Sequence, residues 1–330
     1  MNILITGGAG YIGTLLTKKL LNLNHKITVL DTFWFGNHLP KHKNLKIIKK
    51  DLLEVKEKDL KNIDIVYHLA SVANDAASML DTKLTWEISC LGTLNLCNIC
   101  KKIKIKKFIF ASSGSVYGIK KEKKVTEKLS LKPISDYNKT KMIAEKVIES
   151  FSKFFRIYLV RPGTVFGYSP RMRLDLMINI LTFHALSKKR ITVFGGSQTR
   201  PFIHVYDAAR SIVMSLKAKK EDVQNEVFNV GGNDLNYTLL EVANLIKLNI
   251  KDTNLNIEKA NQDARNYNVS FEKIKHKLGF EPKFSLEEGI LQVIERFKEK
   301  DNDFDYSSPL YSNFMHMSEN GRDLLGSLEY

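Results

Sequence analysis

Residues 3–13 read Ile-Leu-Ile-Thr-Gly-Gly-Ala-Gly-Tyr-Ile-Gly, and this stretch decides the fold. A short apolar run, typical of a buried strand, leads into a Gly-x-x-Gly-x-x-Gly pattern and then into residues with helical periodicity. Gly7 permits a tight turn, Gly10 lets the backbone approach a diphosphate, and Gly13 lets the helix lie close to the strand. Free N–H groups and the dipole of that helix favour a bound diphosphate. The residues expected to contact such a dinucleotide are Gly7, Gly10, Tyr11, Ile12 and Gly13.

An acidic residue follows at the distance that this kind of site requires. The second strand-like segment, residues 26–30, is followed by Asp31, 18 residues after Gly13. A carboxylate there hydrogen-bonds the adenosine ribose hydroxyls and repels a 2′-phosphate, which favours NAD over NADP as the cofactor. Alternatively, Asp31 only ends the strand or caps a helix. The upstream glycines favour the cofactor interpretation.

The first half of the chain alternates short apolar runs with helical patterns. This alternation is typical of βαβ units and predicts the fold class α/β, with a doubly wound parallel sheet of the Rossmann type that binds ligands at the carboxyl ends of its strands. The strands are expected at residues 2–6, 26–30, 45–49, 64–68, 107–112 and 155–160, and the helices at residues 12–22, 84–102 and 137–154.

After about residue 165 this alternation ends, and the elements become mixed. We expect a Rossmann domain over residues 1–165 with a return segment near 202–232, then a smaller C-terminal α/β substrate domain over 166–300. Residues 301–330 form a polar C-terminal tail that either wraps around the protein or is partly disordered. The later helices are expected at residues 174–187, 207–217 and 238–248, the last with a Thr238 cap, and the later strands at 191–194, 202–205 and 227–230.

The composition is that of a folded globular chain. It has 330 residues, of which 43% are hydrophobic, so it can bury a sizeable core. Its apolar runs are much shorter than the roughly 20 residues of a membrane span. Because we also see no basic leader or cleavage site, we expect a cytoplasmic location and no membrane partner. Cys90, Cys97 and Cys100 lie in one apolar helical pattern, so we expect packed core thiols rather than a redox pair or a metal site.

The chain is strongly basic, with a formal net charge of +15. A nucleic-acid-binding surface would gather this charge on one face, with aromatic residues between the basic ones. The lysines here are instead spread along the whole sequence, so we expect no nucleic-acid partner. Either the lysine content has no function of its own, or its positive potential attracts an anionic substrate.

Tyr137 and Lys141 form a Tyr-x-x-x-Lys pattern at the start of an amphipathic segment. The spacing places the phenol and the ammonium on one helical face. Tyrosine has an ordinary pKa of about 10. The ammonium and a positive nicotinamide ring are expected to lower this pKa, so that Tyr137 acts as a base. The alternative is a surface tyrosine on a lysine-rich helix, because the pattern arises often by chance in such a chain.

Residues 108–118 favour the catalytic interpretation. A buried strand ends here in small hydroxyl residues, at the edge where a parallel sheet presents groups to a ligand. We expect Ser113 to hydrogen-bond the reacting oxygen, and Ser112 and Ser115 to be turn residues. The candidate catalytic residues are therefore Ser113, Tyr137 and Lys141.

Together these motifs resemble the extended short-chain dehydrogenase/reductase family, and within it the NAD-dependent nucleotide-sugar epimerase/dehydratase group. The matching stretches follow the family's order over about residues 1–290. They are TGGAGYIG (6–13), Asp31, Asp51-Leu52, HLAS (68–71), SSGSVYG (112–118), YNKTK (137–141), RPGTVFG (161–167) and RPFIHVYDAAR (200–210).

The resemblance implies further cofactor contacts. Asp51 and Leu52 would contact adenine, Pro162 would lie by the nicotinamide, and Lys141 would also hold its ribose. Family members commonly form homodimers through two helices, which correspond here to residues 84–102 and 137–154. Burial in the monomer core explains the apolar content of the first helix equally well. The remaining residues expected to line the cofactor are Leu69, Ala70 and Ser71.

The substrate implied by the resemblance is a nucleotide-diphosphate sugar. Arg200 and Arg265 resemble the family's pair of arginines on the substrate diphosphate, and a guanidinium can indeed fork onto two phosphate oxygens. An ordinary surface or interdomain ion pair is the alternative for each. Arg173 is a third candidate. Thr164 lies near the position of a family asparagine that contacts the substrate phosphate, and Ser89 replaces a second asparagine. The resemblance therefore does not fix the identity of the sugar.

Gly114 and Ser115 occupy the places where family 4,6-dehydratases carry an Asp-Glu pair. Their absence disfavours dehydration, and also decarboxylation, which keeps the glutamate. We therefore expect an NAD-dependent nucleotide-sugar 4-epimerase that acts by transient oxidation at C4, with Tyr137 as the base. The alternative is a nucleotide-sugar 4-dehydrogenase or 4-ketoreductase without epimerisation. A Rossmann protein without activity that binds RNA is disfavoured, because all three candidate catalytic residues are intact.

Overall fold

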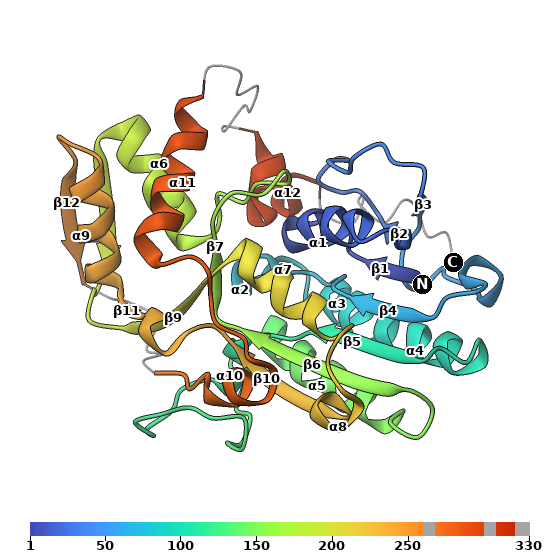
Figure 1. Cartoon of the computed structure of the whole chain (residues 1–330). Helices are drawn as coiled ribbons and strands as arrows, with labels where there is room; N and C mark the ends of the chain where they lie inside the picture. Colours follow the sequence, from blue (N-terminus) through green and yellow to red (C-terminus); the bar gives the residue numbers. More distant parts are fainter. Residues whose placement is uncertain (260–267, 300–307, 321–330) are drawn as a thin grey trace.

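A seven-stranded parallel sheet forms the centre of the molecule (Figure 1). The structure, a computed structural model, describes residues 1–259, 268–299 and 308–320. The strand order is β10-β6-β5-β4-β1-β2-β3, and it reverses at β1, which is where a doubly wound sheet binds its ligand. This confirms the predicted fold class. The strands of this sheet are β1 (Asn2–Thr6), β2 (Lys26–Asp31), β3 (Leu45–Lys49), β4 (Ile65–His68), β5 (Lys107–Ala111), β6 (Arg156–Pro162) and β10 (Glu226–Val230).

Alternate residues of the central strands fill two separate cores, one on each face of the sheet. On β1, Ile3 and Ile5 pack with apolar residues of helices α1 and α7. Leu4 points to the opposite face and packs with α4 and α5. This alternation explains why the strand is apolar along its whole length. The helices of the two faces are α1 (Tyr11–Asn22), α7 (Val205–Met214), α4 (Gly92–Lys102) and α5 (Asp136–Ser150).

A third apolar core joins three helices to a two-stranded sheet, at one side of the large sheet (Figure 1). Helix α9 begins as predicted at Thr238, whose hydroxyl accepts from the Glu241 N–H while the Glu241 carboxylate accepts from the Thr238 N–H. The limits of the predicted domains stay a prediction. This part comprises α6 (Met177–Lys188), β8 (Arg190–Phe194), α9 (Leu239–Asn249), β12 (Asn254–Glu258) and α11 (Leu286–Lys298), with a second small sheet of β7 (Thr164–Phe166), β9 (Thr199–His204) and β11 (Asn236–Thr238).

The helix predicted over residues 84–102 is interrupted. A short helix, α3 (Thr82–Trp86), leads into a π-helical turn, Glu87–Leu91, before α4 begins. The Ser89 hydroxyl of this turn is buried and has no hydrogen-bond partner in the described part of the chain. An apolar pattern cannot show such a turn, because one extra residue per turn hardly changes which positions are apolar. π turns are rare and often lie at functional sites.

Other predicted elements differ at their ends. The helix predicted from residue 174 begins only at Met177, and the Leu174 N–H donates to the Tyr311 carbonyl (2.7 Å). The helix predicted up to residue 154 ends at Ser150. The remaining described elements are η1 (Glu57–Leu60), α2 (Asp75–Leu80), η3 (Gly114–Tyr117), α8 (Lys220–Val223), η4 (Asn233–Leu235), α10 (Glu272–Leu278), η5 (Pro309–Tyr311) and α12 (Asn313–Asn320).

Candidate active site

A cavity of about 590 Å³ opens at the carboxyl edge of the large sheet, a size usual for small-molecule sites. Every predicted site residue that the structure describes lines this cavity, whereas Arg265 lies outside the described residues. The residues that converge here are Gly7, Gly10, Tyr11, Ile12, Gly13, Asp31, Asp51, Leu52, Leu69, Ala70, Ser71, Ser113, Tyr137, Lys141, Pro162, Thr164, Arg173 and Arg200.

The glycine turn leaves room for a ligand to approach its backbone. Gly7 has a φ of +70°, and a Cβ there would lie only 2.7 Å from the Ala70 backbone nitrogen. A Cβ at Gly13 would collide with the Gly7 carbonyl oxygen, so only glycine lets α1 lie this close to the turn. The N-terminus of α1 borders the cavity. A turn without side chains at a helix N-terminus fits a diphosphate, so the residues present fit a dinucleotide.

Asp31 ends β2 beside this turn. Its two carboxylate oxygens accept hydrogen bonds from the backbone N–H groups of Ala9 and Phe33, each at 2.9 Å. Burial raises the pKa of Asp31, while these hydrogen bonds and the charge of Arg171 act to lower it. The carboxylate is thus fixed to the glycine turn itself, at the place predicted for a ribose contact.

The predicted lowering of the pKa of Tyr137 is wrong for this structure. Burial of the phenol, followed by the negative charge of Asp75, raises the pKa of Tyr137. A hydrogen bond with Ser113 and the charge of Arg173 oppose this rise without cancelling it. The sequence could not show the effect, because Asp75 comes from a different element, α2.

Lys141 lies one helical turn beyond Tyr137, as the spacing predicted. Its Nζ is 5.9 Å from the centroid of the Tyr137 ring and donates to the Ala111 carbonyl oxygen at 2.8 Å. Burial lowers the pKa of Lys141 to about 8, against the opposing charge of Glu145. The ammonium is therefore held at the end of β5 in surroundings that disfavour its charge.

A chain of hydrogen bonds runs from Ser113 to Asp75. The Ser113 and Ser115 hydroxyl oxygens are 2.7 Å apart, and Ser115 donates in turn to the Asn138 side-chain oxygen. The Asn138 amide then donates to Asp75 (2.9 Å). Ser115 is therefore more than the turn residue that was predicted. Asp75 was missed, because an acid in the first turn of a helix has the pattern of an ordinary helix start.

Ser112, also predicted as a turn residue, belongs to a buried ionic network behind Lys141. Its hydroxyl donates to the Glu145 carboxylate at 2.5 Å, and the Arg161 Nε donates to the same oxygen at 2.9 Å. Arg161 also donates to the Tyr117 hydroxyl (2.9 Å). All of these side chains are buried. Because every partner is hydrogen-bonded, the network fixes β5, α5 and β6 relative to one another.

The described arginines of the predicted substrate site have different surroundings. Arg173 donates from Nε and Nη2 to the Asp175 carboxylate at 2.8 and 2.7 Å, in a forked ion pair. Arg200, which is buried on β9, donates from Nη1 to the Thr199 carbonyl at 3.0 Å. Both guanidinium groups belong to residues that line the cavity together with Thr164 on β7. An anion in this part of the cavity would face positive charge.

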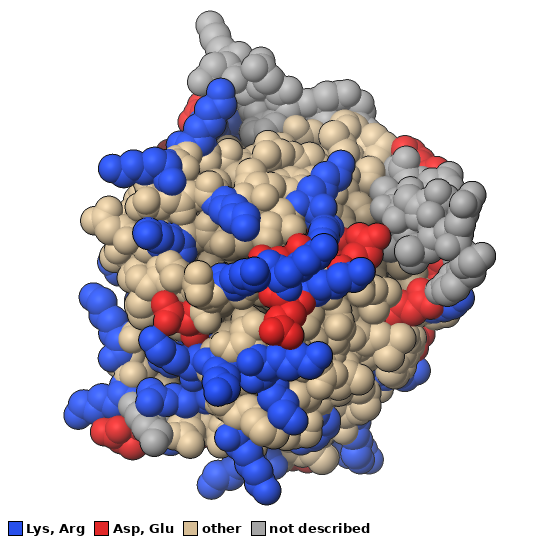
Figure 2. Space-filling model, turned by 90° about the vertical axis from the view of Figure 1, so that its right-hand side faces the viewer, with Lys and Arg blue, Asp and Glu red and all other residues tan. Residues whose placement is uncertain are grey.

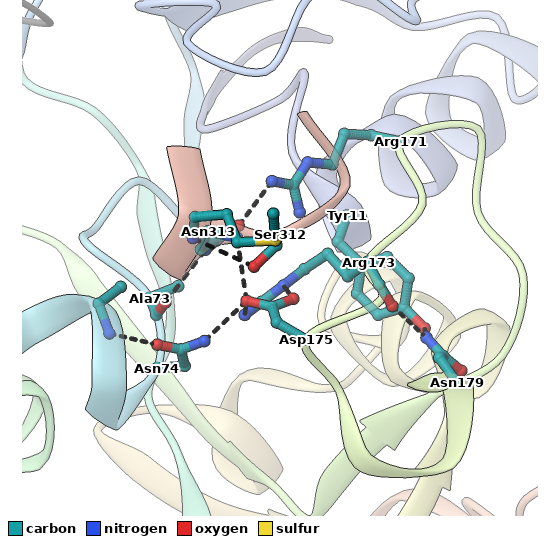
Figure 3. Close-up of polar contacts among 11 residues, drawn as sticks. Tyr11, Ala73, Asn74, Arg171, Arg173, Asp175, Asn179, Ser312 and Asn313 are labelled. Carbon is teal, nitrogen blue, oxygen red and sulfur yellow. Dashed lines mark hydrogen bonds and ion pairs between the residues drawn. The ribbon is translucent and has the colours of Figure 1, made fainter. Parts of the chain in front are cut away.

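Two further cavity residues were missed by the sequence analysis. Arg171 lines the cavity and lies over the ring of Phe35, in the loop after β2. Asn313, from the C-terminal segment, also lines the cavity and accepts a hydrogen bond from Arg171 (Figure 3). Of the two, only Arg171 could have been suspected from the sequence, because it is a basic residue two positions before Arg173. Asn313 follows no motif, since its contacts are with residues far away in the sequence.

The surface and the cysteines behave as the composition suggested. Figure 2 shows Lys and Arg side chains spread over one face of the molecule, with acidic side chains between them. Cys97 and Cys100 are buried free thiols, and burial raises the pKa of both, so they are core residues. Among the described helices, none is long and apolar enough to cross a membrane. The cytoplasmic location stays a prediction.

Comparison with known proteins identifies the family. The NAD dependent epimerase/dehydratase family matches residues 3–231, which include the glycine turn, Asp31 and the Tyr137–Lys141 pair. The chain belongs to this family. The predicted resemblance to the extended short-chain dehydrogenase/reductase group is thereby confirmed. As a member of the NAD dependent epimerase/dehydratase family, the chain is an enzyme that uses NAD, and both predictions are confirmed.

The relatives carry out more than one reaction. The chain is 31% identical to a Bacillus subtilis protein described as an uncharacterized UDP-glucose epimerase, over 89% of this chain and 97% of that one. It is 30% identical to the UDP-glucuronic acid decarboxylase 1 of Danio rerio, over 89% of this chain and 72% of that one. Among solved structures, the UDP-glucuronic acid 4-epimerase of Bacillus cereus, in complex with UDP-glucuronic acid and NAD, is 30% identical with a TM-score of 0.80, over 89% of this chain and 98% of that one.

Proposed function

We propose that this enzyme is a nucleotide-sugar 4-epimerase that oxidises C4 transiently, with Tyr137 as the base. The observation that carries the proposal is the convergence of Ser113, Tyr137 and Lys141 at one side of the NAD cavity, with no carboxylate directly after Ser113. Epimerisation by oxidation and reduction needs one base and one hydride carrier, and no second acid and base pair.

The reaction would begin at the C4 hydroxyl of the sugar. NAD supplies the hydride acceptor and later the hydride donor, and its oxidised ring adds a positive charge that favours the phenolate. The phenol oxygen of Tyr137 takes the hydroxyl proton while C4 loses its hydride and becomes a ketone. Ser113 holds the reacting oxygen by a hydrogen bond. After the sugar turns over, hydride returns to the other face of C4, and Tyr137 returns the proton.

The surroundings of residue 114 support epimerisation over dehydration or decarboxylation. A Cβ at Gly114 would lie 3.1 Å from the Pro162 carbonyl oxygen, so a carboxylate side chain fits poorly there. The hydroxyl of Ser115 is held by Asn138. Burial of the phenol, followed by the charge of Asp75 at the end of that hydrogen-bonded chain, raises the pKa of Tyr137 and so favours the protonated phenol. A 4-dehydrogenase or 4-ketoreductase that does not turn the sugar is the second candidate.

We further propose that the substrate is a UDP-sugar, bound through its diphosphate by Arg200 and Arg173. The support is the position of these two buried arginines in the cavity wall, together with the names of the relatives, which mention UDP-sugars. Thr164 lies on β7 within the same wall. Arg265 stays a predicted fourth contact.

Direct analysis of the products tests the proposed function. The enzyme with NAD is incubated with UDP-glucose and UDP-glucuronic acid, and then with the corresponding GDP-, CDP- and dTDP-sugars. Proton NMR follows the configuration at C4, and absorbance at 340 nm follows reduced cofactor. We expect a 4-epimer with no net reduction of NAD. Stoichiometric reduced cofactor, carbon dioxide or a dehydrated sugar would each contradict the proposal and identify the alternative reaction.

We also propose that the enzyme forms a homodimer through residues 84–102 and 137–154. Leu91 and Leu94 are 54% and 40% exposed on this surface, although they belong to an apolar pattern. Light scattering after size exclusion should give twice the monomer mass, and Leu91→Glu should give the monomer. A wild-type monomer would contradict this proposal.

A further inference from the structure

The C-terminal segment, residues 308–320, contributes a residue to the cavity wall although nearly three hundred residues separate it from the glycine turn. Its helix α12 contacts α2, and Met317, only 5% exposed, joins the apolar core that also covers one face of the sheet. The first residue of α12, Asn313, is 5% exposed and lines the cavity. The segment therefore contributes part of the cavity wall.

Asn313 connects two loops that border the cavity (Figure 3). Its side-chain amide donates to the Ala73 carbonyl at 3.0 Å, and its backbone N–H donates to the Asp175 carboxylate at 3.1 Å. Its side-chain oxygen accepts from the Arg171 Nη2 at 2.5 Å. Ala73 precedes the Asn74 cap of α2. One side chain thus ties the Arg171 guanidinium to the loop after β4.

Arg171 is an unusual residue for a cavity wall, because it is a nearly buried cation. Only 2% of it is exposed, and its Cζ lies 3.9 Å from the centroid of the Phe35 ring. Its Nε is buried and has no hydrogen-bond partner among the described residues. Its neighbour Arg173, by contrast, is engaged in a forked ion pair with Asp175. A buried donor on a charged group is costly unless an acceptor reaches it.

The position of Arg171 indicates which anion would reach it. Burial, together with the positive charge of Arg173, lowers the pKa of Arg171 to about 9, and the negative charges of Asp175 and Asp31 oppose this fall. The charge of Arg171 in turn opposes the rise that burial causes in the pKa of Asp31. Phe35 belongs to the loop that leaves β2 directly after Asp31, and it lines the cavity as well. Arg171 therefore lies on the side of the cavity formed by β2 and the glycine turn, which is the side that fits the dinucleotide.

We propose that Arg171 binds the diphosphate of NAD, and that Asn313 from the C-terminal segment is its positioning residue. NAD and the sugar nucleotide both contain a diphosphate, so the experiment has to distinguish binding of the cofactor from binding of the substrate. The inference rests on the cofactor cavity and not on the proposed epimerisation.

Binding measurements test the proposal without any catalytic turnover. Protein freed of cofactor is titrated with NAD+ by calorimetry, and separately with UDP, and the NAD carried through purification is counted per chain. The variants are Arg171→Ala, Arg171→Lys, Asn313→Ala and the Arg171→Ala/Asn313→Ala double variant. Glu319→Ala, an exposed residue of α12, is the matched control, and circular dichroism checks that each variant is folded.

We expect Arg171→Ala to weaken NAD+ binding by about 10- to 100-fold, since a hydrogen bond to a charged group is lost. Asn313→Ala should weaken it by about 3- to 10-fold. Arg171→Lys should retain part of the affinity, because it keeps the charge but loses the fork. The Asn313→Ala change should add little in the Arg171→Ala background, because Asn313 acts through Arg171. UDP affinity and the control should change less than about 2-fold.

Three results would overturn the proposal. The first is NAD+ affinity that stays unchanged in both Arg171→Ala and Asn313→Ala. The second is a loss of UDP affinity at least as large as the loss of NAD+ affinity, which would assign Arg171 to the substrate. The third is full additivity in the double variant, which would give Asn313 a general packing role. If Arg171→Ala does not fold, Arg171→Lys and Asn313→Ala give the same comparison. If the variants lose NAD+ affinity but the wild-type enzyme shows no epimerase activity, this inference holds and only the proposed function is contradicted.

Discussion

The glycine turn and the C-terminal segment border the same cavity, but they are built in different ways. In residues 3–31 the contacts are repeated at fixed spacings: the Gly7 N–H donates to the Leu30 carbonyl (2.9 Å), and the Ala9 N–H donates to Asp31 (2.9 Å). In the C-terminal segment, Asn313 contacts Ala73, 240 positions away. A site residue can thus be recognised from sequence where backbone geometry fixes its role, and not where long-range packing does.

The largest expected effect concerns Tyr137, in the part of the cavity that is formed by recognisable sequence motifs. Tyr137→Phe removes the hydroxyl that takes the C4 proton, so kcat should fall by about 1,000-fold or more. The affinity for NAD+ should stay within about 2-fold of wild type, because the ring remains in place. Steady-state kinetics and calorimetry give the two numbers. A variant that keeps a tenth of the activity would place the base elsewhere, and Asp75, whose charge acts on Tyr137, is the carboxylate to test next.

Lys141 connects activity with stability. Lys141→Met should lower kcat by about 100-fold, and it should stabilise the protein by about 2 kcal/mol at pH 7, since a buried ammonium is removed at the loss of one hydrogen bond. Burial lowers the pKa of Lys141 to about 8. Below that pH the lysine is charged in the folded state, and the free-energy cost of burying this charge lowers the stability by its full amount. The penalty disappears as the pH rises from about 8 to the ordinary lysine value of about 10.4.

The stability gain of Lys141→Met should therefore shrink over that range of pH. Urea unfolding of both proteins at pH 7, 9 and 10.5 measures it. A gain that does not depend on pH would show that the ammonium of Lys141 is not penalised by burial. Lys141→Arg, which stays charged, is the control that should keep the wild-type stability at pH 7 or lose some.

Asp31 should show a smaller effect, on the choice of cofactor. Asp31→Asn keeps an acceptor for the Ala9 N–H but removes the negative charge, so NAD+ binding should weaken by about 5- to 10-fold while NADP+ binding improves. Calorimetry with the two cofactors measures the ratio. If that ratio stayed at the wild-type value, Asp31 would be a structural residue of the turn.

The smallest expected effect tests the C-terminal segment as a packing element. Met317→Ala should lower the free energy of unfolding by about 1 to 2 kcal/mol, because Met317 is still 5% exposed and its surroundings can partly collapse. Ile148→Ala, at a fully buried residue of the same core, should cost about 3 to 4 kcal/mol. Urea unfolding gives both values. Equal losses would mean that the segment is as integral to the fold as the Rossmann core.

The sequence therefore predicted the sheet, the glycine turn and the positions of the catalytic candidates, since these follow from periodicity and spacing. It did not predict the pKa of Tyr137, because the sign depends on burial and on Asp75 from another element. It also missed the π turn at residues 87–91, and it left open whether residues 301–330 wrap around the protein, so it did not place Asn313 in the cavity. Arg171 was passed over because only the folded structure shows that it lines the cavity and that its Nε is buried without a partner among the described residues.

The central claim, hydride removal and return at C4 with Tyr137 as the base, can be tested with one labelled substrate. A UDP-sugar carrying deuterium at C4 is converted by the enzyme with NAD in ordinary water, and the product is analysed by NMR and mass spectrometry. We predict a 4-epimer that keeps its deuterium at C4, with none formed by Tyr137→Phe. Epimer that has exchanged the label with water, or inversion at another carbon, would contradict the account.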